Sequence, residues 1–73
     1  KMEKIIKLGN KEVKMRKPLV RDVRAVCDIA NDFEREIAMI ANLTGISIDE
    51  IDNMELGDLS LLQNALKGFI VKK

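Results

Sequence analysis

The fold is decided first by residues 4–15, which read KIIKLGNKEVKM. Apolar and charged residues alternate on both sides of Gly9-Asn10, a pattern typical of two strands joined by a two-residue turn. Glycine at the first turn position favours a type II′ hairpin, because it adopts positive φ without steric cost. The turn pairs Ile6 with Val13 across the hairpin. One face then carries the apolar side chains Ile6, Leu8, Val13 and Met15.

Helical spacing of apolar residues begins after the hairpin. Pro18 ends the second strand, because proline cannot donate a hydrogen bond to a strand partner. The spacing predicts one helix over about residues 20–31 and a second with Asp32 as its N-cap, closed by Gly45 in the left-handed conformation. Their expected core stripes are Val23, Val26, Cys27 and Ala30, and then Phe33, Ile37, Ile40 and Ala41.

Two further helices are predicted from capping residues. Ser47 to Glu50 has the sequence of a capping box, which opens a short helix through Ile51. Asp58 is the expected N-cap of the last helix. The last helix has an apolar stripe of Leu59, Leu62, Leu66 and Phe69.

Together these elements predict an α+β fold, with an N-terminal β-hairpin on a bundle of three to four short α-helices. We expect residues 1–73 to form a single domain, with the hairpin in residues 1–17 and the helical bundle in residues 20–73. An isolated hairpin is only marginally stable in water, so its apolar face must rest on the helices.

The composition excludes several classes of site. The 73 residues include no His, no Trp, no Tyr and one Cys. A disulfide framework, a Cys/His zinc site and a catalytic pair with imidazole therefore all lack their residues. No stretch approaches the roughly 20 apolar residues that span a bilayer. We expect no enzyme activity, no cofactor and no metal site.

Charge is distributed unevenly along the chain. Residues 1–24 carry nine basic and three acidic side chains, whereas residues 25–60 carry one basic and nine acidic ones. This asymmetry is typical of two ordinary solvated faces, of charges matched within the fold, or of head-to-tail association between copies. Near the start of the first helix, we expect Asp22 to form a solvated ion-pair cluster with Arg21 and Arg24.

One local pattern indicates an alternative function. Ala41, Gly45 and Ile51 have the spacing of a helix-turn-helix, which would make the chain a small DNA-binding regulator. The second helix of that motif would expose Ser47, Asp49, Glu50, Asp52 and Asn53, of which three are carboxylates and none is basic. Because DNA affinity depends on neutralising phosphates, this helix is a poor reader of DNA.

A longer pattern of helix ends and turns covers residues 33–70. A helix ends in the turn at residues 43–47, a short acidic helix follows, and an aliphatic–Asp step leads into the last helix. The matching residues are Ile40, Leu43, Thr44, Gly45, Ile46, Ser47, Ile48, Asp49, Glu50, Ile51, Asp52, Met54, Leu56, Asp58, Leu59 and Phe69. With the Lys-rich hairpin, Pro18 and Asp22 before it, the chain resembles the tail assembly chaperones of contractile-tailed phages, in particular the Mu-like group. Leu19 departs from that family, in which a Thr cap often follows the proline.

The resemblance implies a function that composition does not supply. Members of this family are chaperones of the tape measure protein, the long helical chain that sets tail length. The resemblance thus implies a phage or prophage protein that binds the tape measure protein in the cytoplasm of the bacterial host and keeps it soluble during tail assembly. It leaves open a longer frameshifted form, a homo-oligomer and a structural role in the finished tail. Neither a membrane nor a nucleic acid is an expected partner.

A chaperone of this kind needs apolar surface beyond its own core. At 100° per residue, Met39 and Leu43 project away from the apolar stripe of the second helix. Leu61 and Ala65 likewise leave the stripe of the last helix. We therefore predict that these four residues bind the partner. Two alternatives stay open: both sides of the central helices serve the core, or the same surface joins copies of the chain.

Overall fold

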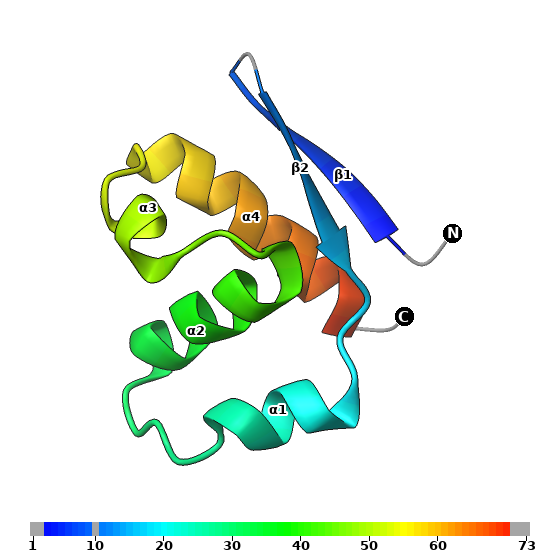
Figure 1. Ribbon diagram of the computed structural model, residues 1–73, viewed down its shortest axis with the longest axis vertical. Helices are drawn as coiled ribbons and strands as arrows, with labels where there is room; N and C mark the ends of the chain where they lie inside the picture. The colour runs from blue at the N-terminus through cyan, green and yellow to red at the C-terminus, as the bar shows by residue number, and fades with distance from the viewer. Residues whose placement is uncertain (1–2, 10, 71–73) are drawn as a thin grey trace.

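The computed structural model describes residues 3–9 and 11–70, and it places a two-stranded antiparallel hairpin before four helices (Figure 1). The elements are β1 (Glu3–Leu8), β2 (Lys11–Arg16), α1 (Val20–Val26), α2 (Asp32–Thr44), α3 (Ile48–Asp52) and α4 (Leu56–Ile70). This order confirms the predicted α+β class with an N-terminal hairpin.

The hairpin has the predicted register. Ile6 lies opposite Val13, and Leu8 lies opposite Lys11. Gly9 has a φ of 62°, the positive value that the tight turn requires. Asn10, the second residue of the predicted turn, lies outside the described residues. The predicted apolar face is buried in full: Ile6, Leu8, Val13 and Met15.

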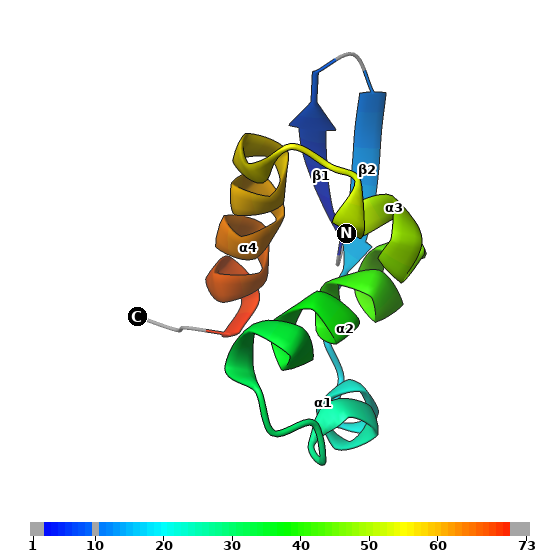
Figure 2. The same cartoon turned by 90° about the vertical axis from the view of Figure 1, so that its left-hand side faces the viewer.

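The hairpin lies across the helices, with β2 against α2 and β1 against α4 (Figures 1 and 2). Met15 of β2, Ile40 of α2 and Leu62 of α4 are completely buried in one shared core. Helix α1 lies beyond α2, away from the hairpin turn. Burial against α2 and α4 thus gives the hairpin the support that it lacks in isolation.

Helix α1 is shorter than predicted. It ends at Val26 rather than near residue 31, because the chain tightens at Cys27 and turns so that Ile29 packs against the core. The amide of Ile29 donates to the carbonyl of Val26 at 3.0 Å, a bond typical of a helix end. The predicted stripe is therefore wrong except at Val26: Val23, Cys27 and Ala30 are exposed.

Two of the predicted helix ends are confirmed. Gly45 closes α2 with a φ of 80°. The Ser47 hydroxyl accepts a hydrogen bond from the Glu50 amide at 3.1 Å and starts α3.

Two predicted N-caps are wrong. Asn31, not Asp32, caps α2, because its Oδ1 accepts from the Glu34 amide at 2.9 Å. Helix α4 begins at Leu56, two residues before Asp58, and the Glu55 carbonyl accepts its first backbone hydrogen bonds. The predicted cap of α2 is one residue too late and that of α4 is three residues too late, because several polar residues compete for each cap.

The predicted stripes of α2 and α4 are largely confirmed. Ile37, Ile40, Leu59, Leu62 and Leu66 are buried, and Ala41 and Phe69 are partly buried against the core. Phe33 is the exception, with 52% of its surface exposed. It stands in the first turn of α2, where it lines a surface hollow with Leu56 rather than filling the core.

Candidate partner-binding site

Three helices form an apolar groove with a volume of about 340 Å³. Val26 of α1, Met39 of α2 and Leu66 of α4 are buried and make its floor. Val23 of α1 and Ile70 of α4 stand at its rim with about half of their surfaces exposed. The groove therefore offers apolar contact from two sides to a ligand that enters it.

Polar side chains along α2 border the groove and are fixed by neighbours. Arg35 donates to the Ile29 carbonyl at 2.6 Å and also pairs with Asp32 one turn earlier. Glu36 accepts a hydrogen bond from Gln63 of α4 at 2.9 Å. These bonds hold the charged border in place, so both signs of charge are presented beside the apolar floor.

The four residues predicted to bind the partner do not form one exposed surface. Met39 lies on the groove floor, and Leu43 lies deeper in the core with 3% of its surface exposed. Leu61 is 45% exposed. Ala65 is half-buried against the core, and its carbonyl accepts a hydrogen bond from Lys4 Nζ at 2.9 Å. Both sides of α2 thus serve the core, as the alternative interpretation expected for so small a protein.

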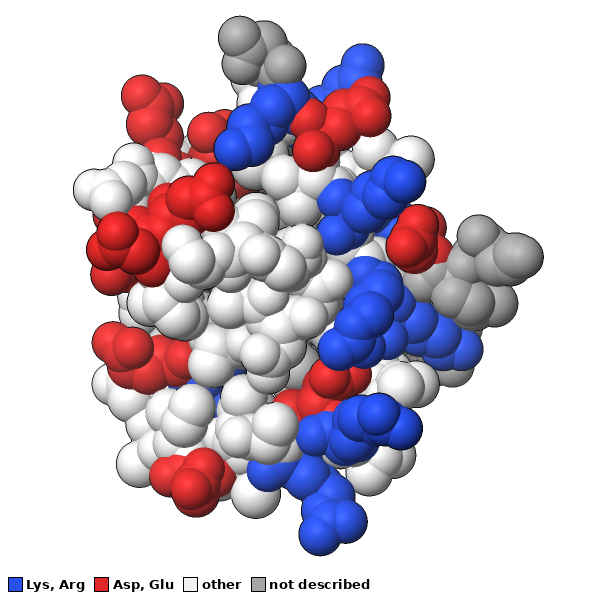
Figure 3. Space-filling model, in the orientation of Figure 1, with Lys and Arg blue, Asp and Glu red and all other residues white. Residues whose placement is uncertain are grey.

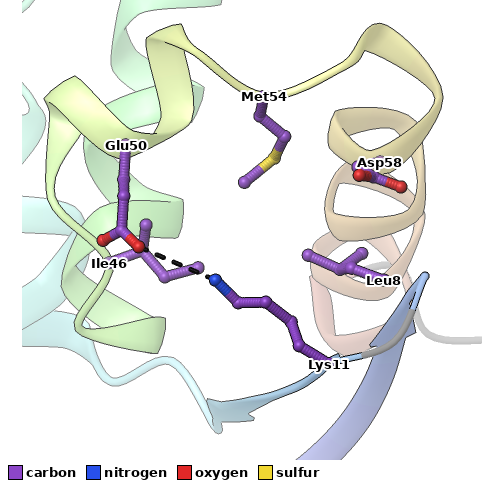
Figure 4. Close-up of a pocket in the computed structure, with 6 residues that line it drawn as sticks. All are labelled: Leu8, Lys11, Ile46, Glu50, Met54 and Asp58. Atoms are coloured by element: carbon purple, nitrogen blue, oxygen red, sulfur yellow. Dashed lines mark ion pairs between the residues drawn. The ribbon is translucent and has the colours of Figure 1, made fainter.

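The hairpin also meets α3 at a smaller hollow, which Figure 4 shows. Leu8, Ile46 and Met54 supply its apolar lining. Lys11 Nζ lies 3.7 Å from Glu50 Oε2 across the opening, and both side chains are well exposed. An exposed ion pair of this length contributes little to stability, so the hollow is chiefly a junction between two elements.

Acidic and basic side chains gather on different parts of the surface. Figure 3 shows blue side chains over the hairpin and α1 on one side, and red side chains over α3 and the neighbouring helix starts on the other. Among the described residues, Lys11–Glu50 is the only ion pair that joins the basic N-terminal region to the acidic one. The charges are therefore mostly not matched within the fold.

Asp22 is bound by a partner that the sequence analysis did not assign to it. Its buried carboxylate accepts two hydrogen bonds from Arg16, at 2.8 and 2.9 Å, and one from the Leu19 amide at 2.8 Å. These bonds lower the pKa of Asp22 from 3.8 to about 2. The expected solvated cluster with Arg21 and Arg24 is therefore wrong, because Asp22 turns inward to cap α1 and to hold the end of β2.

The residues of the expected helix-turn-helix lie at the turn between α2 and α3, but the surface of α3 is acidic. Ile51 is buried between α2 and α3, and Gly45 makes the turn. Helix α3 has five residues and exposes Asp49, Glu50 and Asp52. A surface of this charge repels phosphate, so the turn is a packing device here.

In residues 3–9 and 11–70, no group of three or more His, Cys, Asp or Glu side chains is placed to hold a metal ion. Within the same ranges, every helix is too short or too polar to cross a bilayer.

Comparison with known proteins gives one match. A family model described as phage tail assembly chaperone proteins, E, or 41 or 14, matches residues 9–71. The chain belongs to this family. Neither a curated protein nor a solved structure matches it significantly. The match covers β2 and all four helices, so every element that lines the groove lies within this chaperone family's span.

Sequence reasoning missed the rim of the groove. The sequence pattern predicts Val23 in a core stripe, because the early end of α1 has no strong signal such as Gly or Pro in the sequence. Ile70 lay outside the predicted stripe of α4. Ile70 is apolar and follows the partly buried Phe69. This pair was the one sign in the sequence that the last turn of α4 carries apolar surface on two sides.

Proposed function

We propose that this tail assembly chaperone binds an amphipathic helical segment of the tape measure protein in the groove between α1, α2 and α4. Binding takes place in the cytoplasm of the bacterial host and keeps the tape measure protein soluble until the tail tube forms around it. The observation that carries the proposal is the apolar groove, in a chain that belongs to a chaperone family of phage tails.

The chemistry of the groove suits a helix as ligand. An amphipathic helix places apolar side chains on one face, and such a face fits a groove with an apolar floor and a charged border. Met39 on the floor has a flexible, polarizable side chain, which adapts to different apolar partners. Arg35 and Glu36 then face the polar flanks of the bound helix and favour one orientation.

The energetics are those of reversible binding. Each large apolar side chain that the client buries contributes about 1.5–3 kcal/mol before the entropy of association is subtracted. With a few such contacts the chaperone holds its client reversibly. It can then release the client when tube subunits compete for the same surface of the client. This action requires no chemical step, so the proposal is of a binding protein and not of an enzyme.

The test is co-expression with the tape measure protein of the same phage, with soluble client as the measurement. Ile70→Asp and Val23→Asp each place a charge at the rim of the groove and should reduce the soluble client several-fold. Leu61→Asp is the matched control, because Leu61 is similarly exposed on α4 and does not line the groove. Circular dichroism must show unchanged helix content in all three variants.

The outcomes distinguish a wrong binding site from a wrong function. Loss of soluble client with Leu61→Asp alone would place binding at Leu61, one of the four residues predicted from sequence, and would reject the groove. An unchanged yield of soluble client when the chaperone is omitted would reject the function itself.

A further inference from the structure

Helix α1 presents a basic and apolar surface to solvent. Val20 is 76% exposed, and Leu19 beside it is about half exposed. Three exposed cations surround them: Lys17, Arg21 and Arg24. Val20 and Arg24 lie one turn apart on the same side of the helix, so apolar and charged groups share one face. We refer to these five residues as the α1 surface.

A hollow of about 180 Å³ lies on the acidic side of the molecule, where α2, α3 and α4 meet. Phe33, Met54 and Leu56 line it with apolar atoms, and Asp52 lies among them. Glu55 is exposed between Met54 and Leu56. Phe33 and Leu56 remain largely exposed, so the fold leaves this apolar lining open. We refer to it as the acidic hollow.

The two surfaces complement each other in charge and in apolar character. In the described part of the chain, the ion pairs are Lys11–Glu50, Arg16–Asp22 and Arg35–Asp32, and none of them uses a charge of the α1 surface or of the acidic hollow. Both sets of charges therefore face solvent and are available to another molecule.

We propose that the α1 surface of one copy docks into the acidic hollow of a second copy of this chain. Leu19 and Val20 enter the hollow against Phe33 and Leu56, while Arg21 and Arg24 meet Asp52 and Glu55. Two different surfaces join in this contact, so the interface is head-to-tail and each copy keeps one surface free for the next. A symmetric contact of either surface with itself would bring like charges together, which is unfavourable.

The placement of the two surfaces allows both to be used at once. Helix α1 lies at one end of the molecule, whereas α3 and the start of α4 lie on another side, beyond α2 (Figure 1). A copy can therefore bind one neighbour through α1 and another through the hollow. The proposal uses this chain alone, so it stands or fails independently of client binding.

The test is the mass of the purified chain by sedimentation over a range of concentrations. A monomer has a mass of 8.3 kDa. We expect the average mass to rise with concentration at about 0.01 M salt and to fall at about 1 M salt, where the Debye length shrinks to about 3 Å. A mass that stays at the monomer value at low salt and high concentration would overturn the proposal.

Charge reversal identifies the two surfaces. Arg21→Glu with Arg24→Glu makes both surfaces acidic, and Asp52→Lys with Glu55→Lys makes both basic. Each double variant alone should associate at least about tenfold more weakly than the original chain, because like charges now meet. An equal mixture of the two should regain association, since each variant offers the charge that the other lacks.

A matched control is Lys7→Glu with Lys67→Glu, which changes the net charge as much as Arg21→Glu with Arg24→Glu but alters exposed residues outside both surfaces. This control should associate like the original chain. Association that survives either double reversal, or a mixture that stays monomeric, would overturn the head-to-tail assignment even if the chain self-associates.

Discussion

Arg16 at the end of β2 binds both carboxylate oxygens of Asp22 in α1, at 2.9 and 2.8 Å. The same carboxylate accepts the Leu19 amide and so begins the helix. The Arg16 side chain is 43% exposed, whereas the Asp22 side chain is only 6% exposed. The carboxylate is therefore the buried partner of the pair. One buried acid thereby fixes both the start of α1 and its attachment to the hairpin.

This pair makes stability depend on pH in a defined range. The pKa of Asp22 is about 2 in the folded protein and 3.8 in the unfolded reference, so its contribution is complete above pH 3.8 and is lost as pH falls through 2. A shift of this size corresponds to about 2 kcal/mol, and solvent screening of the guanidinium reduces the expected value to about 1–2 kcal/mol. The measurement is urea unfolding, followed by circular dichroism, from about pH 5 to about pH 2.

Variants separate Asp22 from the other carboxylates that titrate over the same range. Asp22→Asn should lower stability at neutral pH and remove about 1–2 kcal/mol of the loss between about pH 4 and pH 2. Asp28→Asn is the control, because Asp28 is exposed, and it should follow the original chain. An identical pH dependence for Asp22→Asn and the original chain would contradict the assignment.

Arg16→Lys should lower the free energy of unfolding, although it keeps the charge. A guanidinium donates two parallel hydrogen bonds to a carboxylate, whereas an ammonium acts as a single point charge. Arg24→Lys is the matched control, since Arg24 is exposed on α1 and should change stability very little. Equal stability of the two variants in urea unfolding would show that the two-bond geometry contributes nothing.

Much of the fold follows from local sequence patterns. Residues 4–15 determine the hairpin register because a shift of one residue would turn Val13 and its neighbours to solvent. Gly45 and Ser47 mark their helix ends because each satisfies a specific backbone requirement. Features of this kind depend on a few adjacent residues, and the sequence alone contains them.

The predictions from sequence were wrong where tertiary contacts, and not local sequence, determine the structure. Helix α1 ends early because Ile29 packs against the core. This contact depends on the position of α2. Asp22 binds Arg16, six residues earlier, because the short segment between β2 and α1 brings the strand end to the helix start. The groove also depends on tertiary contacts, because its floor needs α1, α2 and α4 in place. Helical spacing alone therefore could not show that Met39 lies on the floor of a groove.

Removal of the cap of α2 is a further test of where that helix begins. Asn31→Ala should lower the unfolding free energy by about 1 kcal/mol, because the Glu34 amide loses its side-chain acceptor. Asp32→Ala should cost less, about 0.3 kcal/mol, since it removes only an exposed ion pair and a favourable charge near the helix start. Thermal or urea unfolding measures both, and a larger loss with Asp32→Ala would restore the cap predicted from sequence.

Lys4 and Gly68 are coupled across the hairpin and the last helix. Lys4 Nζ donates to the Ala65 carbonyl at 2.9 Å and lies 4.5 Å from the centre of the Phe69 ring. A β-carbon at Gly68 would overlap this ammonium group. Gly68→Ala should therefore gain about 0.5–1 kcal/mol of helix propensity and lose a comparable amount by displacing Lys4, with little net change.

The coupling becomes visible when Lys4 is removed. In a Lys4→Ala background, Gly68→Ala should stabilise the protein by the full propensity gain of about 0.5–1 kcal/mol, because nothing is displaced. Gly57→Ala is the control, since a β-carbon there meets no atom within 4 Å, and its effect should be the same in both backgrounds. Urea unfolding of the four chains in the cycle gives the interaction energy. If Gly68→Ala changes stability equally with and without Lys4, the ammonium group does not hold the end of α4 to the hairpin, and the attachment of β1 to this helix rests on apolar packing alone.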